Sequence, residues 1–311
     1  MLLGILAGLS AGALWGFTFV APLFVAPWTV FDLTVLRFAV FGTVAIGTLA
    51  PGGFPALRTL SLRDATLFLV LSLTGFTGYY LMAALAIVLI GPAIPTLVIG
   101  ALPLTITLVG NRGRNAAPFR SLVIPLALIV VGLLAVNVEA LAAAPTPADR
   151  WRFVLGAALA VLAHLAWLAY GLINARALAS RPQAEAGTWT ALTGLATLVT
   201  TLPLAVLGAT LGVSGFTDHG IFGAGTGHLW LWAVVTGFLS TTVATLAWNA
   251  ASQRLPVALA GQLIVSETIF ALLYGFLALG QWPSTAELLG GALLVAGVVT
   301  GVRVFAHARG G

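Results

Sequence analysis

The sequence predicts an all-α membrane protein in which ten transmembrane helices form two inverted five-helix repeats. Of its 311 residues, 60% are hydrophobic and 7% are charged, whereas a soluble domain carries about 25% charged residues. Ten apolar stretches come close to or exceed the roughly 20 residues with which a helix crosses a bilayer. The two halves of the chain also show similar features in the same order.

The ten spans are separated by residues that favour turns. Proline- and glycine-rich segments such as 51–55 and polar segments such as 281–284 mark these turns. The glycine-rich stretch 209–227 has few bulky residues and predicts an exposed loop. The predicted spans, numbered 1 to 10 below, are residues 4–25, 31–49, 65–89, 93–110, 120–138, 153–174, 188–208, 228–250, 258–278 and 286–305.

Arginine residues predict how the spans are oriented. The thirteen basic residues are all arginine, and cytoplasmic loops carry the excess of basic residues in membrane proteins. With both termini cytoplasmic, the inner loops and tail hold Arg58, Arg63, Arg112, Arg114, Arg120, Arg176, Arg181, Arg254, Arg303 and Arg309. The outer loops then hold Arg150 and Arg152, and Arg37 lies within span 2. We therefore expect a multi-pass protein of the cell inner membrane with both termini in the cytoplasm.

Composition also excludes several classes of protein. The basic residues are scattered, which argues against nucleic-acid binding. The lack of cysteine excludes disulfides, thiolate catalysis and cysteine metal sites, and we expect no cofactor, no metal and no catalytic residue. An intramembrane enzyme needs a metal cluster, an Asp pair or a Ser–His unit, whereas His164 and Glu267 stand singly on different helices. A channel favours rings of like charge; the sequence offers none, so a channel is kept only as a weaker alternative to a carrier.

The sequence of each half begins in a similar way, which suggests a repeat. A tryptophan followed by small and aromatic residues lies at Leu14–Phe17 and again at Ala166–Gly171. We predict an N-terminal five-span repeat at 1–140, an outer linker at 141–152 and a C-terminal five-span repeat at 153–311. An odd number of spans makes the second repeat enter the membrane from the opposite side, as in transporters whose site lies near the midplane. The alternative is that apolar helices simply resemble one another.

The order of several short motifs resembles the EamA-type members of the drug/metabolite transporter superfamily. The motifs are Leu14-Trp15-Gly16, Leu36-Arg37-Phe38, Ser266-Glu267-Thr268, Leu277–Gly280 and Leu288–Val298. The resemblance covers nearly the whole chain and implies a ten-span carrier of small metabolites. In detail the chain is most similar to the YddG-type exporters of aromatic amino acids. It departs from the family after Glu267, where Pro is common in place of Thr, and after Gly280, where Glu is common in place of Gln.

Glu267 is the acidic residue that lies near the centre of an apolar run. Because a carboxyl group in the bilayer is costly, it usually marks a substrate or ion path. Tryptophan and tyrosine normally concentrate at the membrane interfaces, yet Trp15, Tyr79–Tyr80 and His164 fall at a similar depth to Glu267. These residues predict one central site. Core packing of Trp15, a hydrogen-bonded packing role for His164 and a neutral structural role for Glu267 remain open.

Helical spacing adds residues to the predicted substrate site. At 100° per residue, two aromatic residues share a face of span 6 with His164, and polar residues at spacings of three and four form a stripe on span 8. Polar stripes on membrane helices face protein or water rather than lipid, although hydroxyl groups can instead bond their own helix. The added residues are Trp167, Tyr170, Trp248, Asn249, Gln262 and Ser266.

Three residues are expected to take part in gating. Gly12 and Gly16 belong to a series of glycines at every fourth position of span 1, which lets a second helix approach closely and slide or pack statically. Pro103 leaves a carbonyl group unpaired within span 4 and should kink that helix.

We expect a carrier that exports amino acids with apolar or aromatic side chains through one central site. Its partners are then a small-molecule substrate and the lipid bilayer. Organic cations are a second substrate class, that of a multidrug exporter, because aromatic faces attract cations. A sugar-phosphate exchanger would need cations at the midplane, where the sequence places none; Arg37 is expected to snorkel outward or to pair with Asp32. The sequence leaves the oligomeric state open.

Overall fold

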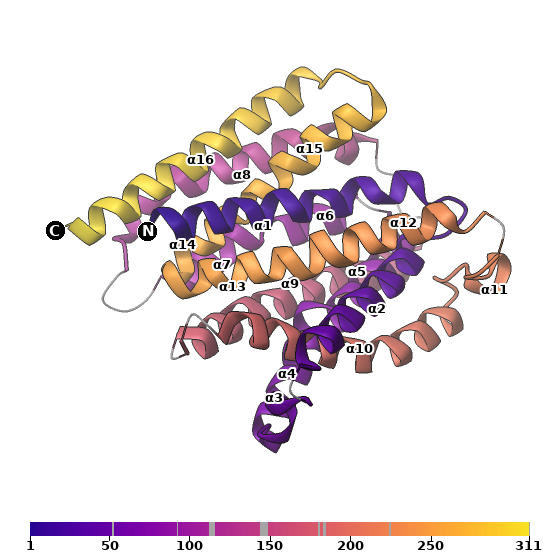
Figure 1. Ribbon diagram of the computed structural model, residues 1–311. Helices are drawn as coiled ribbons and strands as arrows, with labels where there is room; N and C mark the ends of the chain where they lie inside the picture. The colour runs from indigo at the N-terminus through magenta and orange to yellow at the C-terminus, as the bar shows by residue number, and fades with distance from the viewer. Residues whose placement is uncertain are drawn as a thin grey trace.

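The computed structural model describes residues 1–51, 53–91, 93–111, 116–143, 149–179, 181–182, 185–223 and 225–310, with side chains through residue 307. These residues form helices and connecting turns, with no strand among them, and ten apolar helices are long enough to cross a membrane. The predicted all-α fold with ten spans is therefore confirmed (Figure 1). Arg112, Arg114, the side chain of Arg309 and part of the predicted linker 141–152 lie outside the described residues.

Six of the ten spans are continuous α-helices, and four contain an interruption. The continuous spans are α1 (Leu2–Val20), which a 3-10 turn η1 (Ala21–Phe24) prolongs, α2 (Val30–Leu49), α8 (Phe119–Ala142), α9 (Arg150–Ala179), α10 (Ala186–Thr210) and α16 (Thr285–Gly310). The interrupted spans are α4 (Leu62–Gly75) with α5 (Thr77–Ile90), α6 (Ala93–Gly100) with α7 (Leu102–Gly110), α12 (Gly227–Val235) with the π-helix η3 (Thr236–Val243) and α13 (Ala244–Arg254), and α14 (Val257–Leu263) with α15 (Val265–Leu279). Two short helices, α3 (Pro55–Arg58) and α11 (Phe216–His219), lie in loops.

Local sequence sets the helix ends. Thr29 and Asp32 form a reciprocal capping box at the start of α2, which satisfies amide groups that have no partner within the helix. The Ser61 hydroxyl caps α4 in a similar way, by accepting from the Asp64 amide. Gly280 ends α15 in the left-handed region, at φ 62°, where residues with a Cβ are disfavoured.

The four interruptions have local causes or signatures. Pro103 lies in the first turn of α7, and the helix is interrupted two residues earlier at Ala101, in agreement with a proline that disturbs this span; a kink of its axis stays a prediction. Span 3 breaks at Phe76, whose ψ of −96° is not helical. In span 8, the hydroxyl groups of Thr241 and Thr242 each donate to the carbonyl five residues earlier, as in a π-helix. Span 3 therefore contains a non-helical residue, whereas the junction residues of spans 4, 8 and 9 remain right-handed helical and only the hydrogen-bond pattern changes there.

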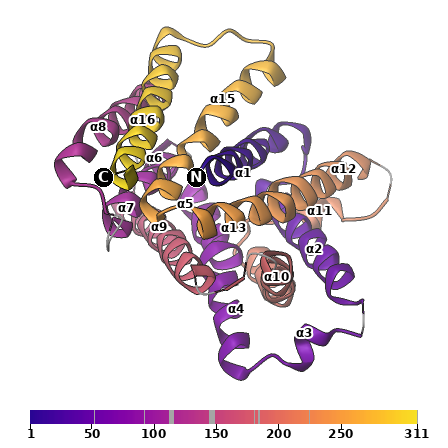
Figure 2. The same cartoon turned by 60° about the vertical axis from the view of Figure 1, so that its left-hand side comes forward.

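The closest helix pairs each join a helix of the first half to one of the second. α8 packs along α16, α2 along α10, α5 along α9 and α1 along α15, as Figures 1 and 2 show. α7 also packs against α14. The two predicted five-span repeats would therefore be intertwined across the whole bundle.

Glycines explain how closely α1 approaches span 9 and the end of span 8. Gly4, Gly8, Gly12 and Gly16 are all buried on one face of α1. A Cβ atom at Gly8 would lie 2.6 Å from Leu263 Cδ1, and one at Gly16 would lie 3.0 Å from the Ala271 backbone nitrogen. The expected close helix contact is confirmed.

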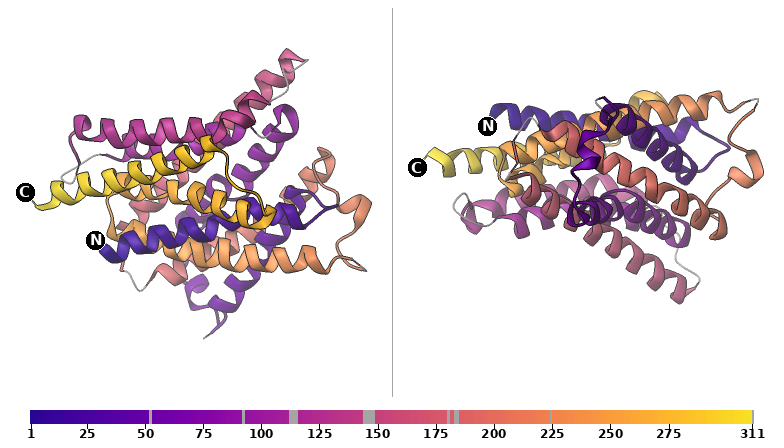
Figure 3. Two further views of the ribbon diagram at one scale, coloured as in Figure 1. Left: turned by 90° about the horizontal axis from the view of Figure 1, so that it is seen from above. Right: turned by 60° about the horizontal axis from the view of Figure 1, so that its bottom comes forward.

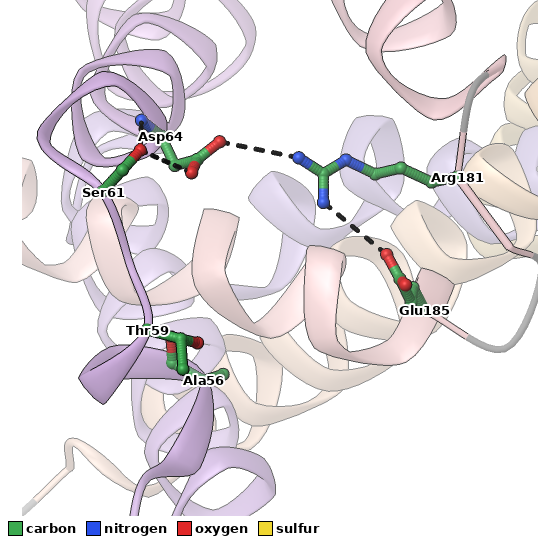
Figure 4. A network of polar contacts seen from close by, with 6 residues as sticks. All are labelled: Ala56, Thr59, Ser61, Asp64, Arg181 and Glu185. Carbon is green, nitrogen blue, oxygen red and sulfur yellow. Dashed lines mark hydrogen bonds and ion pairs between the residues drawn. The ribbon is translucent and has the colours of Figure 1, made fainter.

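Both termini lie at one end of the bundle, and α11 lies at the other (Figure 3). At the terminal end, Arg181 pairs with Asp64 at 3.5 Å and Glu185 at 3.6 Å, as Figure 4 shows. The Gln253 side chain nearby donates to the Pro182 carbonyl oxygen. The loops around residues 61, 181 and 254 thus gather at one end, as the arginine distribution predicts; that this end faces the cytoplasm stays a prediction.

The stretch 209–227 is more ordered than the exposed loop that its composition predicts. Val213 is buried, and residues 216–219 form α11. The Asp32 carboxylate accepts hydrogen bonds from the Ser214 hydroxyl at 2.7 Å and the Gly215 amide at 3.0 Å. These bonds hold the loop against the start of α2, while most of its described residues are exposed, as predicted.

Candidate functional site

Five aromatic residues from four spans meet inside the bundle. The ring centres of Trp15 on α1, Trp167 on α9 and Trp248 on α13 lie 5.7–6.1 Å apart in all three pairs. Tyr170 lies 5.7 Å from Trp167 and 5.6 Å from Phe76, which sits at the break of span 3. We call these five residues the aromatic cluster. Phe76 was not among the predicted residues; its signal in the sequence was an aromatic residue next to the Gly75 helix end.

The aromatic cluster is stabilised by its own contacts but is incompletely buried. Aromatic pairs in these geometries contribute about 0.5–1.5 kcal/mol each beyond surface burial. Trp248 is 1% exposed, and its indole N–H has no acceptor. Trp15 and Trp167 are half-buried. The cluster therefore offers flat apolar faces together with an unpaired donor.

Arg37 lies at the far end of a chain of aromatic contacts that starts at the aromatic cluster. The Phe38 ring is 5.9 Å from Phe76 and 5.4 Å from Tyr80, and Tyr80 is 4.9 Å from Tyr79. The guanidinium carbon of Arg37 lies over the Tyr80 ring, 4.4 Å from its centre. The structure thus brings Tyr79 and Tyr80 together with a cation.

The expectation for Arg37 was wrong. Its side chain is 5% exposed, so it is enclosed by protein rather than extended toward the interface. Asp32 does not pair with it, because the Asp32 carboxylate accepts from Thr29, Ser214 and Gly215. Arg37 Nε has no hydrogen-bond acceptor.

Glu267 lies in the first turn of α15 and is half-buried. Its carboxyl group lies within electrostatic range of the Arg37 guanidinium. It forms no ion pair within 4 Å in the described part of the chain. The site thus includes one cation, which packs on the Tyr80 ring, and one carboxyl group.

His164 bridges the two parts of the broken span 4. Its Nδ1 atom is 2.9 Å from the Val98 carbonyl oxygen on α6, and its Nε2 atom is 2.9 Å from the Thr105 hydroxyl on α7. The imidazole is 7% exposed. Both ring nitrogens are therefore used to hold α6 and α7 on either side of Ala101.

Asn249 belongs to a closed hydrogen-bond network. Its side-chain oxygen accepts from Asn174 at 2.9 Å, and its side-chain nitrogen donates to the Thr190 hydroxyl at 2.8 Å. The Trp189 indole donates to Asn174 in turn. The network joins spans 6, 7 and 8 and occupies both polar atoms of Asn249.

Gln262 and Ser266 lie in helix interfaces. The Ser266 hydroxyl donates to the Leu263 carbonyl oxygen at 2.6 Å and faces Gly12, which has no room for a Cβ. Gln262 is fully buried against Gly301 of α16, and neither of its amide atoms has a partner. Within the described residues, no side-chain hydrogen bond joins Asn249, Gln262 or Ser266 to the aromatic cluster.

The described residues hold no group of three or more His, Asp or Glu side chains that could bind a metal ion. What the site combines is stacking surface, one enclosed cation and one carboxyl group. Such a set can bind and orient a small molecule, and it holds no activated nucleophile.

Comparison with known proteins identifies the family of the chain. Residues 154–302 match the EamA-like transporter family. The chain is 34% identical over 312 residues to the inner membrane protein YtfF of Escherichia coli strain K12, in an alignment that covers 97% of this chain and 96% of YtfF. A crystal structure of a protein at 23% identity has the same fold, with a TM-score of 0.75 over 96% of this chain and 97% of the other. The chain therefore belongs to the EamA-like transporter family and is a multi-pass membrane transporter, not an enzyme.

Proposed function

We propose that this transporter exports aromatic and other amino acids across the cell inner membrane, and that the aromatic cluster binds their side chains. Membership of the EamA-like family supports transport, and the name of the E. coli relative supports the inner membrane. The predicted similarity to YddG-type aromatic amino-acid exporters is part of this proposal. Both termini would face the cytoplasm, since the basic loops gather at their end of the bundle.

The observation that carries the substrate class is the contact of Trp15, Trp167 and Trp248. Three indole rings from α1, α9 and α13 meet pairwise within 6.1 Å. Small-molecule sites are lined mainly by apolar and aromatic side chains with a few polar groups that fix orientation. A flat aromatic side chain can stack on such rings, and Arg37 and Glu267 supply the charged groups nearby.

Backbone interruptions support a mechanism of alternating access. Broken membrane helices occur where the backbone borders a binding site, and movement of one repeat against the other exposes the site to each side in turn. Here spans 3 and 8 are both interrupted, and so are spans 4 and 9. These spans occupy the third and fourth positions of the two predicted repeats. Gly12, Gly16 and Pro103 would then allow the helices to shift, as the sequence suggests.

Export of quaternary or lipophilic cations is the second candidate function. Tryptophan faces attract cations by roughly 0.5–2 kcal/mol, and the aromatic cluster offers three of them. The enclosed charge of Arg37 opposes a cation without a carboxylate. We therefore place amino acids first.

Counterflow in proteoliposomes tests the proposed function. Vesicles that contain the purified transporter are loaded with unlabelled tryptophan, and uptake of labelled tryptophan is measured. We expect uptake that competes with phenylalanine and tyrosine and more weakly with quaternary amines. Competition by sugar phosphates together with none by aromatic amino acids would contradict the proposal.

A further inference from the structure

We propose that Arg37 is the anchor for the carboxylate of the substrate and that Glu267 receives its ammonium group, so that the transporter selects zwitterions. The inference rests on the proposed function, amino-acid export, because it assigns Arg37 and Glu267 to the two charged groups of one amino-acid substrate. It makes Arg37 a specificity-determining residue.

The first argument is the environment of Arg37. A cation inside a membrane protein is costly and is normally paired with an acid or with backbone carbonyls. Arg37 is 5% exposed, yet its Nε has no acceptor, and no ion pair reaches it within the described residues. The Asp32 carboxylate, five residues earlier in α2, accepts instead from Thr29 and from Ser214 and Gly215 in the loop after α10. An acceptor is therefore missing at this position, and a substrate anion would supply it.

The second argument is the geometry of the guanidinium group. It lies over the Tyr80 ring at 4.4 Å and near Phe38 at 5.0 Å. An aromatic face stabilises the cation without using its N–H groups. Those groups point outward in the guanidinium plane, where they match the two oxygens of a carboxylate. The tyrosine thus holds the arginine in place and leaves its donors available.

The third argument is the opposite charge across the site. Glu267 lies within electrostatic range of Arg37, and no ion pair within 4 Å joins these two groups among the described residues. An acid and a base that are near each other but unpaired suit a ligand that carries both charges. The α-carbon of an amino acid bears both, and its side chain could then extend along the aromatic chain through Phe38 and Phe76 to the aromatic cluster.

Three matched indole compounds separate these charges. Tryptophan carries both groups, indole-3-propionate carries the carboxylate only, and tryptamine carries the ammonium only. Binding to the purified, detergent-solubilised transporter is measured as the ligand-dependent rise in melting temperature. We compare the wild type with Arg37→Gln, Arg37→Lys and Glu267→Gln, and use Arg176→Gln as a control because Arg176 is exposed at the end of α9.

We expect the wild type to bind tryptophan best and indole-3-propionate next. Arg37→Gln should weaken both about 10- to 100-fold, as for loss of a hydrogen bond to a charged group, and should leave tryptamine binding unchanged or stronger. Arg37→Lys should keep the preference for carboxylates with weaker binding, because an ammonium lacks the planar pair of donors. Glu267→Gln should weaken tryptophan and tryptamine and spare indole-3-propionate.

Several outcomes would overturn the inference. One is that Arg37→Gln binds tryptophan and indole-3-propionate as tightly as the wild type. Another is that no carboxylate probe stabilises the wild type, or that glycerol phosphate does so in place of tryptophan. Equal loss of all three ligands in Arg37→Gln, with Arg37→Lys no better, would show a purely structural role. A wild type that binds tryptophan in this way but fails to transport it would contradict the proposed function and support the anchor.

Discussion

Trp15 and Trp167 meet edge to face, with ring centres 5.8 Å apart and ring planes at 79°. They mark the starts of the two predicted repeats, on spans 1 and 6. Spans 2 and 7, 4 and 9, and 5 and 10 also pack as pairs. A two-fold relation between the halves would bring corresponding spans together near its axis in this way. These contacts support the repeat at 1–140 and 153–311, which stays a prediction.

The orientation can be tested by labelling, because the chain contains no cysteine. A cysteine at Arg181 should react with an impermeant thiol reagent only when the cytoplasmic side is accessible. A cysteine at Trp282, which is 95% exposed in the loop before α16, should react from outside in intact cells. The reverse pattern of labelling would contradict the proposed topology.

Gly12 should tolerate no side chain. A Cβ at this position would collide with the Ser266 hydroxyl, so we expect Gly12→Ala to destabilise the transporter by about 1–3 kcal/mol. The melting temperature of the purified protein measures the effect. Adding Ser266→Gly should restore part of the loss. Gly47→Ala on α2 serves as the control, because no atom lies within 4 Å of its Cβ position; equal melting temperatures for Gly12→Ala and Gly47→Ala would refute the close contact.

His164 should stabilise the broken span 4. His164→Ala removes its bonds to Val98 and Thr105, and we expect a loss of about 1–3 kcal/mol, since buried polar groups lose their partner. Thr105→Val should lose less, because one of the two bonds remains. Thr43→Val is a matched control, as the Thr43 hydroxyl bonds its own helix on an exposed face. If thermal unfolding of His164→Ala equals that of the control, the histidine does not hold α6 and α7 together.

Substitution of Glu267 distinguishes proton-coupled transport from facilitated diffusion. We expect facilitated diffusion, because Glu267 lies in the middle of its span, whereas the other acids of the described spans, Asp32, Asp64, Glu139 and Glu287, lie near helix ends. Uptake into liposomes should then be unchanged by an imposed pH gradient, and Glu267→Gln should retain tryptophan exchange with lower affinity. Accumulation of substrate above equilibrium in the wild type, lost in Glu267→Gln, would favour proton exchange instead.

The fold was predictable because hydrophobicity, turn residues and arginine positions each report on the bilayer directly. The interruptions within four of the spans were harder to predict from the sequence. Pro103 indicated the interruption of span 4. The break at Phe76 depends on packing, and the π-helix of span 8 is accompanied by hydroxyl hydrogen bonds. The tertiary contacts of polar residues could not be read from spacing. Asn249 lies on the predicted face but is saturated by Asn174 and Thr190.

The direction of the Arg37 side chain also could not be predicted from the sequence. Its position near the end of span 2 suggested an escape to the interface. Whether a long side chain turns outward or inward depends on the neighbouring helices. Here the Arg37 guanidinium group packs on the ring of Tyr80 in α5. By contrast, Trp15, Trp167 and Trp248 do contact one another, as expected for large rigid side chains placed by depth and helical face; that they bind substrate stays a prediction.

Counterflow of labelled tryptophan in tryptophan-to-alanine variants tests the central claim most directly. Trp15→Ala and Trp167→Ala each remove one ring of the aromatic cluster, whereas Trp151→Ala removes a ring that is 69% exposed at the start of α9. We predict that the first two variants are inserted normally and lose about tenfold or more in tryptophan affinity, as for loss of about 1.4 kcal/mol, while Trp151→Ala transports like the wild type. Parental transport by both Trp15→Ala and Trp167→Ala would show that the substrate binds elsewhere.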